Sequence, residues 1–349
     1  MMDIAALFKY AMSQGASDLH LAVGRPPIIR VDDVLRDVPA EAPLTPKRIE
    51  EIITGIITAK QREEFLTKRD LDFSFAIPGL TRFRVNVHFE RESMGLVARI
   101  IPTSLPTMEE IGMPPVIYRM LEETRGLILL TGPAGTGKST SLAAMVNHMN
   151  EERAQHIVTL EDPIEFVYTS KRSLIRQREL GADMTSFGEG LRHLLRQDPD
   201  IVVIGEMRDL ETIATAITVA ETGHLVFGTL HTFNASQTVD RIIDSFPDYQ
   251  QSQIRTQISM TLIGIIAQKL LPKRGGGRVG VREVLLNSNA VANLIRENKI
   301  SQIQSVIQMS AAEGMFTMDQ DIARLYREGK ITRETAESHV SRSDILQDH

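Results

Sequence analysis

The chain has 349 residues, of which 42% are apolar and 24% are charged, a formal net charge of −6 and no cysteine. This length predicts two domains, and the composition is that of a soluble globular protein. The acidic balance argues against a nucleic-acid partner, and the missing cysteines exclude disulfides and thiolate metal sites.

Neither terminus nor interior suggests a membrane segment. No apolar run reaches about 18 residues, so we expect no membrane-spanning helix. The opening "MMDIAALFKYAMSQG" lacks the pattern of a signal peptide. We therefore expect a cytoplasmic protein whose attachment to a membrane would come through a partner.

Residues 1–101 are predicted to form a small α+β domain. Apolar residues recur at helical spacing within 3–14, and Thr45 with Pro46 is a favourable helix start. Apolar and polar residues then alternate over 71–77 and 83–89, which predicts a strand meander.

Arginines gather on the polar face of this meander. Arg82 and Arg84 alternate with the apolar Phe83 and Val85, and the next strand adds Arg99. Such a face is either solvated or contacts an anion. The sharper hypothesis is that these arginines reach the γ-phosphate of a nucleotide on a neighbouring subunit, where they would stabilise charge in the transition state.

Four prolines punctuate residues 102–115, which we interpret as a linker. Beyond it, the residues from 116 to 272 are predicted to form an α/β core with a mostly parallel sheet and helices on both faces. Its strands and helices are expected to alternate along the chain. The strands are expected at 127–130, 157–160, 201–204 and 225–229, and the helices near 138–149, 185–196, 209–221 and 235–244.

The end of the core and the tail are predicted to be mainly helical. Ile254, Ile258, Leu262 and Ile265 share a helical face, so Gln250–Leu271 is expected to be one long helix. The sequence "PKRGGG" (272–277) then reads as a flexible break. Residues 273–349 are expected to form a mainly helical C-terminal subdomain.

The sequence "LILLTGPAGTGKSTS" (127–141) places a glycine-rich loop between a strand and a helix. The glycines let backbone N–H groups surround a phosphate, and the helix N-terminus favours negative charge. Lys138 is expected to reach the β- and γ-phosphates of ATP, and Ser139 to ligate Mg²⁺. The predicted nucleotide-binding residues are Gly132, Pro133, Ala134, Gly135, Thr136, Gly137, Lys138, Ser139 and Thr140.

Acids follow two of the predicted core strands. Glu161 and Glu165 lie in "TLEDPIEF", and Glu206 ends "IVVIGE". Functional groups of open parallel sheets gather at the carboxyl ends of the strands, so these acids are expected at the phosphates. They are candidates for orienting or deprotonating the attacking water, and Glu206 is also a candidate magnesium ligand. Which glutamate is the base stays open.

Neighbouring polar residues receive other interpretations. His231 follows the strand 225–229 and could hydrogen-bond a phosphate or a carboxylate, whereas His224, at the other end, is expected to be structural. Asp209 is expected to cap the next helix. Gly205 could let its strand approach the phosphate loop closely.

Together these motifs resemble the ATPases that drive type II and type IV secretion and type IV pili, and within them the pilus retraction motors. The resemblance rests on the phosphate loop, "TLEDPIEF", "RQDPDIVVIGEMRDLET" (196–212), "AETGHLVFGTLHT" (220–232), "SDLHL" (17–21) and "RFRVN" (82–86). It covers nearly the whole chain.

This resemblance implies a PAS-like N-terminal domain, a RecA-like core and a homohexameric ring that hydrolyses ATP with Mg²⁺. It implies that Glu206 and either Glu165 or Glu161 serve catalysis and magnesium, and that Arg84, Arg99 and Arg82 act across the site. The implied partner is the inner-membrane platform protein of the pilus.

The alternatives are an accessory retraction motor acting with paralogous pilus ATPases, an extension or type II secretion motor, and a nucleotide switch without turnover. The accessory role is suggested by "AVANLIRE" (290–297), which reads AIRNLIRE in the retraction motors.

Overall fold

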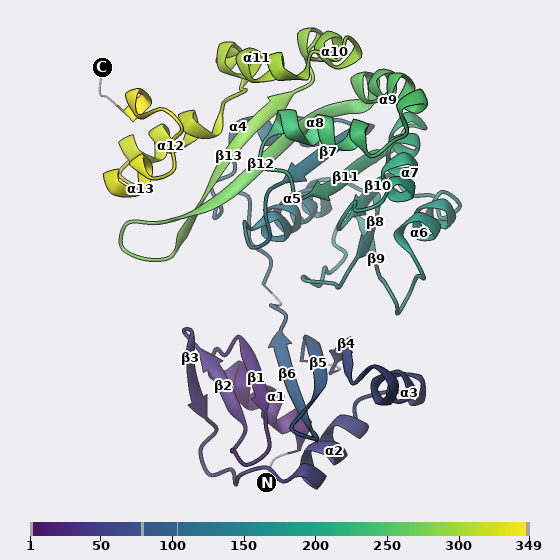
Figure 1. The fold of residues 1–349 in the computed structure, drawn as a ribbon, viewed down its shortest axis with the longest axis vertical. Coiled ribbons are helices and arrows are strands. Elements are labelled where there is room, and N and C mark those ends of the chain that lie inside the picture. The colour runs from purple at the N-terminus through teal and green to yellow at the C-terminus, as the bar shows by residue number, and fades with distance from the viewer. Residues whose placement is uncertain (1–2, 78–79, 103, 347–349) are drawn as a thin grey trace. The chain divides into compact units, whose positions relative to one another are not determined.

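The computed structural model describes residues 3–77, 80–102 and 104–346, and Figure 1 shows their fold. The chain divides into two compact units. Unit 1 comprises Met1–Ser104 with Pro163–Val167, and unit 2 comprises Leu105–Asp162 with Tyr168–His349.

Within the described residues, unit 1 is an antiparallel sheet with three helices, and it contains the strands that the alternating pattern predicted over 71–77 and 83–89. The strand order is β3-β2-β1-β6-β5-β4. Phe83, Val85 and Val87 of β5 enter the core with Phe8 of α1 and Ile49 of α2. The elements are α1 (Ile4–Ser13), β1 (Asp18–Leu21), β2 (Ile28–Val31), β3 (Val34–Asp37), α2 (Pro46–Thr54), α3 (Ala59–Lys68), β4 (Asp70–Ala76), β5 (Arg82–Glu90) and β6 (Ser93–Ile100).

Unit 2 is built on a seven-stranded sheet with the order β13-β12-β7-β11-β10-β8-β9. Every pair is parallel except β12 with β13, so the α/β prediction is confirmed. The strands are β7 (Gly126–Thr131), β8 (His156–Glu161), β9 (Leu174–Glu179), β10 (Ile201–Ile204), β11 (Leu225–Leu230), β12 (Leu262–Pro272) and β13 (Arg278–Leu286).

Helices cover both faces of this sheet. Successive side chains of a strand point to opposite faces. Ile128 and Leu130 of β7 accordingly pack with residues of α4 (Pro115–Leu121) and α5 (Lys138–Glu152). Leu127 and Leu129 pack in a second core with the helices of the other face. These are α6 (Phe187–Leu194), α7 (Leu210–Glu221), α8 (Ala235–Asp244), α9 (Asp248–Thr261), α10 (Asn289–Arg296) and α11 (Ile303–Met309).

The prediction of one helix over Gln250–Leu271 was wrong. Helix α9 ends at Thr261, and β12 begins at Leu262 and lies between β7 and β13. A strand buried on both faces is apolar throughout, so helical spacing in such a run carries no information. The pairing of β12 with β7 has an irregularity at Ile263, where Leu262 and Gly264 face consecutive residues of β7.

Residues 273–277 of the segment "PKRGGG" form the hairpin turn that joins β12 to β13, and Pro272 is the last residue of β12. Lys273 N donates to Gly277 O at 3.0 Å, and Gly275, Gly276 and Gly277 all have positive φ. The outer part of this hairpin carries α12 (Met318–Arg327) and α13 (Arg333–Glu337), through a small core that includes Leu271, Val281 and Leu325. Among the helices of the described residues, none is both long and apolar enough to cross a membrane.

Candidate functional site

The phosphate loop joins the buried strand β7 to the N-terminus of α5. Gly132, Gly135 and Gly137 have φ values of 144°, 77° and 82°, which residues with a side chain rarely adopt. A Cβ at Gly132 would lie 2.4 Å from the carbonyl oxygen of Gln268. The loop is therefore a tight, glycine-dependent turn that presents its backbone at a helix N-terminus, the geometry that suits a phosphate.

Some side chains of the loop form hydrogen bonds within it, and other residues of the loop are accessible to solvent. Thr136 is buried and its hydroxyl donates to Pro133 O at 2.9 Å. Lys138 Nζ donates to Gly132 O at 2.6 Å and to Pro133 O at 3.0 Å. Ser139 and Thr140 are half-buried in the first turn of α5, and Ala134 and Gly135 are exposed.

Gln268 of β12 completes the loop and was missed by the sequence analysis. Its Nε2 donates to Thr136 O at 2.6 Å, and its Oε1 accepts from Ser141 Oγ at 2.7 Å. Residue 268 reaches the loop only because β12 pairs with β7. No local signal could have shown this within a segment interpreted as helix.

Glu206 and His231 lie together, as their predicted places at neighbouring strand ends suggested. His231 Nε2 lies 2.6 Å from Glu206 Oε1, and Arg208 also pairs with this oxygen. Burial raises the pKa of the Glu206 carboxyl, but the hydrogen bonds from Arg208 and His231 outweigh it, so the pKa lies below its usual range. Glu206 is therefore an ionised carboxylate at neutral pH. Arg208 was not predicted, although it stands two residues beyond the acid.

The strand order brings the candidate groups to one edge of the sheet. The strands β7, β11, β10 and β8 are parallel neighbours, so their carboxyl ends coincide. The phosphate loop follows β7, His231 follows β11, Glu206 follows β10 and Glu161 ends β8. This is the edge at which open α/β sheets bind ligands.

Gly205 serves a different contact from the predicted one. Its N–H donates to Leu160 O at 2.7 Å. A Cβ at Gly205 would lie 3.0 Å from Leu160 O and 3.3 Å from Glu161 Cα. The hypothesis that Gly205 allows a close approach to the phosphate loop was therefore wrong, because its close neighbour is the end of β8.

The two acids of "TLEDPIEF" have different surroundings. Glu161 Oε1 accepts hydrogen bonds from Thr159 Oγ1 at 2.6 Å and from Gln177 Nε2 at 2.9 Å. Glu165 is exposed in an irregular segment and belongs to unit 1 by the division of the chain. Glu161 is thus fixed at the edge of the sheet, whereas Glu165 is not part of a helix or strand.

Two residues have the structural roles expected of them. Asp209 caps α7, because its carboxylate accepts from Thr212 N at 2.9 Å. His224 lies at the start of β11, with Nδ1 at 3.1 Å from Val219 O.

The three candidate arginines, Arg82, Arg84 and Arg99, share one face of β5 and β6. Arg84 lies directly opposite Arg99 in the antiparallel register, and Arg82 lies two residues from Arg84 on the same face. Arg99 Nε donates to Asp18 Oδ1 at 3.0 Å, while 69% of the Arg99 side chain is exposed. Like charges directly opposite each other are destabilising, and Asp18, which lies opposite Arg99 on its other side, already supplies one anion at this face.

Comparison with known proteins identifies close relatives. The family model described as type II/IV secretion system protein matches residues 1–275. The chain is 48% identical over 335 residues to the type IV pilus retraction ATPase PilT of Pseudomonas aeruginosa PAO1, covering 96% of this chain and 97% of that protein. It is 38% identical over 346 residues to the type IV pilus ATPase PilU of the same strain, covering 99% and 90%.

Solved structures agree with these matches. A crystal structure of the pilus retraction motor PilT with bound ADP superposes with a TM-score of 0.92 at 43% identity, covering 99% of this chain and 98% of that one. The ATPase DotB of Legionella pneumophila superposes with a TM-score of 0.85 at 27% identity, covering 96% and 94%.

Proposed function

The chain belongs to the type II/IV secretion system protein family, and we propose that within it this protein is a hexameric ATPase that powers the retraction of type IV pili. The observation that carries the proposal is the phosphate loop beside the Glu206–His231 pair, in a chain nearly half identical to a retraction ATPase over almost its whole length.

The phosphate loop is the nucleotide site of this proposal. The contacts of Lys138 with Gly132 O and Pro133 O are ones that its ammonium group exchanges for phosphate oxygens when ATP binds. The positive φ values of the glycines and the N-terminus of α5 suit an anion at this place.

Mg²⁺ fits the oxygen donors of the site. Among the described residues no cluster of three or more histidine, aspartate or glutamate side chains could hold a metal alone. A magnesium ion bound mainly by phosphates and water needs only one or two protein oxygens. Ser139 and Glu206 would supply them, and the ion would neutralise charge that develops on the phosphates.

Two carboxylates, Glu206 and Glu165, are the candidates for acting on the attacking water. Glu206 is ionised and fixed by His231 and Arg208, so it can orient water or accept its proton. Glu165 is the second candidate for this role, and the hydrogen bonds of Glu161 favour a positioning role for that residue.

Arg84, Arg99 and Arg82 would contribute from a neighbouring subunit of the ring. They share one face, on which Arg84 and 69% of the Arg99 side chain are exposed, so a further anion can reach them beside Asp18. A guanidinium donated in trans would make hydrolysis depend on assembly. The ring would then act in the cytoplasm on the inner-membrane platform protein of the pilus.

Deleting the gene in a host with type IV pili tests the proposal. Hyperpiliated cells without twitching are expected. Cells without pili would refute retraction in favour of extension, and unchanged piliation with weakened twitching would favour an accessory role beside a paralogous ATPase.

Phosphate release tests the enzymatic part separately. Purified wild-type protein should hydrolyse ATP, and Lys138→Ala should abolish hydrolysis because the loop loses its ammonium group. A wild-type hexamer that binds ATP without turnover would instead favour a nucleotide switch.

A further inference from the structure

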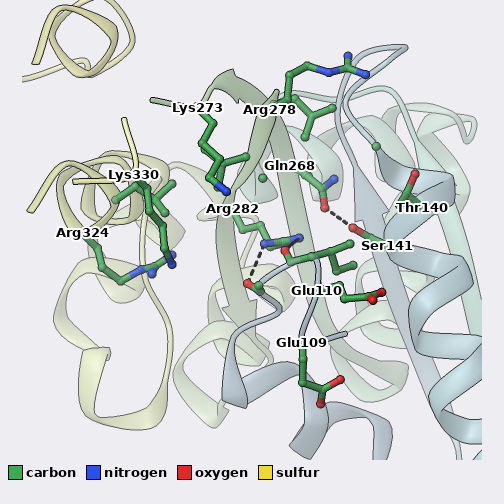
Figure 2. A pocket seen from close by; sticks show the side chains of 17 residues that line it. Glu109, Glu110, Thr140, Ser141, Gln268, Lys273, Arg278, Arg282, Arg324 and Lys330 are labelled. Carbon is green, nitrogen blue, oxygen red and sulfur yellow. Dashed lines mark hydrogen bonds between the residues drawn. The ribbon is translucent and has the colours of Figure 1, made fainter. Parts of the chain in front are cut away.

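Two buried polar side chains lie beside the phosphate loop on adjacent strands. Gln268 of β12 and Arg282 of β13 are directly opposite each other in the antiparallel register, and their exposed fractions are 3% and 2%. Directly opposed residues project from the same face of a sheet. Both line one pocket of about 470 Å³, together with Thr140 and Ser141 of α5. Figure 2 shows these side chains.

Gln268 is bonded to the phosphate loop at two points. Its amide donates to Thr136 O in the loop and accepts from Ser141 Oγ at the start of α5. The backbone of the loop also packs on this residue, because a Cβ at Gly137 would lie 3.0 Å from Gln268 Nε2. A change in the shape of the loop must therefore displace Gln268 or break these hydrogen bonds.

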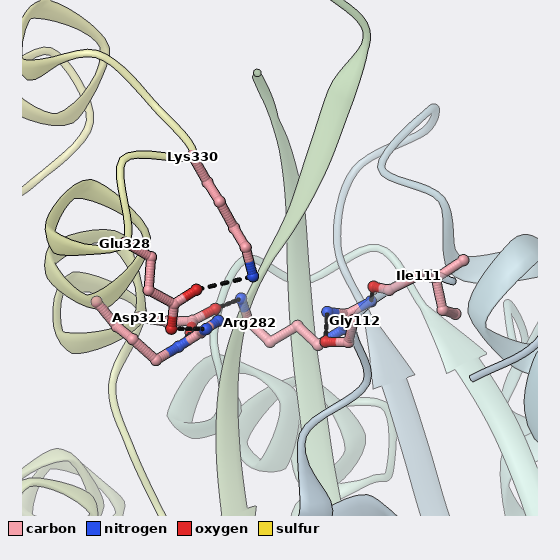
Figure 3. Close-up of polar contacts among 7 residues, drawn as sticks. Ile111, Gly112, Arg282, Asp321, Glu328 and Lys330 are labelled. Carbon is pink, nitrogen blue, oxygen red and sulfur yellow. Dashed lines mark hydrogen bonds and ion pairs between the residues drawn. The ribbon is translucent and has the colours of Figure 1, made fainter. Parts of the chain in front are cut away.

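Arg282 connects β13 to residues 111 and 112, on the side away from the phosphate loop's contacts with Gln268. Its guanidinium donates to Gly112 O and to Ile111 O, each at 3.1 Å, and its backbone N–H donates to Asp321 Oδ2 at 2.8 Å (Figure 3). Residues 111 and 112 follow closely on Leu105, where unit 2 begins in the chain. Arg282 therefore fixes the first segment of unit 2 to the hairpin that carries Gln268.

The charge of Arg282 makes this contact strong. Burial lowers the pKa of its guanidinium to about 10, although Asp321 opposes the shift. Both carboxylate oxygens of Asp321 are engaged elsewhere, because Oδ1 pairs with Arg324 at 2.7 Å and Oδ2 accepts from the backbone N–H of Arg282. The hydrogen bonds of the Arg282 guanidinium group go instead to the carbonyls of Ile111 and Gly112. Removing a partner from a buried charged group costs more than removing one from a neutral group.

We propose that Gln268 and Arg282 form a positioning pair that shapes the phosphate loop and connects its nucleotide state to the segment 105–113. The proposal rests on the proposed function, because it requires a nucleotide at the loop. In this proposal nucleotide binding orders the phosphate loop, and the ordered loop fixes the side chain of Gln268. The neighbouring Arg282 is then held in place on β13, and its hydrogen bonds to the carbonyls of residues 111 and 112 become more stable.

Gln268→Met tests the first half of the pair, because methionine fills a similar volume without donating or accepting these bonds. Full-length protein is titrated with ADP, and hydrogen exchange of 105–113 is followed with and without saturating ADP. In the wild type, ADP is expected to slow this exchange. In Gln268→Met the Kd for ADP should rise by about tenfold, because two buried hydrogen bonds are lost. At saturating ADP the exchange should stay at its nucleotide-free rate.

Gln257→Met is the matched control. Gln257 of α9 donates to Glu221 at 2.7 Å and does not line this pocket. Replacing it with methionine should therefore leave the Kd for ADP and the ADP-dependent protection of 105–113 unchanged. Gln268→Met protein with wild-type affinity and protection would overturn the proposal. Wild-type protein that fails to bind ADP would refute the proposed function instead.

Arg282→Met tests the second half. It should hold the Kd for ADP within about twofold, since Gln268 keeps its loop contacts, but abolish the ADP-dependent protection of 105–113. If Arg282→Met no longer unfolds cooperatively on heating, Arg282→Lys is tested in its place. Lysine keeps the positive charge but cannot donate to both main-chain carbonyls in the geometry of a guanidinium group. Protection that persists in the folded variant would overturn the link.

Discussion

The position of Glu206 depends on the glycine before it, and Gly205→Ala tests this dependence. The added methyl would lie 3.0 Å from Leu160 O and 3.3 Å from Glu161 Cα. Both are main-chain atoms of β8, which is held between β10 and β9 and cannot move away as a flexible side chain would. Overpacking of this kind costs about 1–3 kcal/mol.

Hydrogen exchange of residues 201–207 measures this cost where it arises. The N–H of Gly205 donates to Leu160 O at 2.7 Å, and that of Met207 donates to Thr229 O at 3.0 Å. A loss of about 1–3 kcal/mol in local stability speeds exchange by about 5- to 150-fold. Turnover should fall by about tenfold because the carboxylate shifts, while ADP affinity holds, since the phosphate loop follows β7 two strands away.

Gly188→Ala is the matched control for this experiment. A Cβ at Gly188 would meet the side chain of Glu211 at 2.6 Å, but that side chain is 49% exposed, and moving it disturbs only its exposed ion pair with Arg192. Alanine in the helix α6 should be neutral or stabilising. Exchange of 201–207 in Gly205→Ala within a factor of about two of the wild type would refute the packing argument.

Three further predictions concern the catalytic edge. Glu206→Gln should lower turnover by about a hundredfold or more with ATP affinity retained, and the same comparison for Glu165→Gln identifies the base from steady-state kinetics and equilibrium binding. The pKa of Glu206 is lowered, so its contribution to stability should be full above its ordinary pKa of 4.5 and disappear as the pH falls through the lowered value. Unfolding of wild type and Glu206→Gln at a series of pH values measures this, and a difference that grows in acid would contradict it. Arg84→Ala and Lys138→Ala subunits should each be inactive alone but recover phosphate release when mixed in one ring, whereas no recovery would argue against an arginine acting in trans.

Much of the site was predictable because its signals are local. The phosphate loop, the strand-end acids and the cap at Asp209 each depend on a few consecutive residues and on strand–helix alternation. The parallel order of the strands then brings Glu206 and His231 together, as the rule for carboxyl ends predicts.

The errors arose where tertiary contacts decide the structure. Strand β12 was interpreted as helix because burial on both faces removes the alternation that marks a strand. Strand β9, "LIRQRE", was missed because it is polar and lies at the sheet edge. The role of Gln268 depends on pairing with β7, more than a hundred residues earlier in the chain. Helix α3 was also not predicted, although it carries a local sequence signal, the capping box between Thr58 and Gln61.

The irregular pairing at Ile263 determines where the length of β12 can change during evolution. Ile263 has no partner on β7, because Leu262 and Gly264 face the consecutive residues Leu127 and Ile128. Deleting Ile263 would leave Gly264 opposite Ile128, and every later pair would keep its partner. A deletion among residues 265–267 would instead turn Gln268 to the opposite face of the sheet and move Lys269 into its place. Homologous chains should therefore differ in length at 263 far more readily than between that residue and the glutamine.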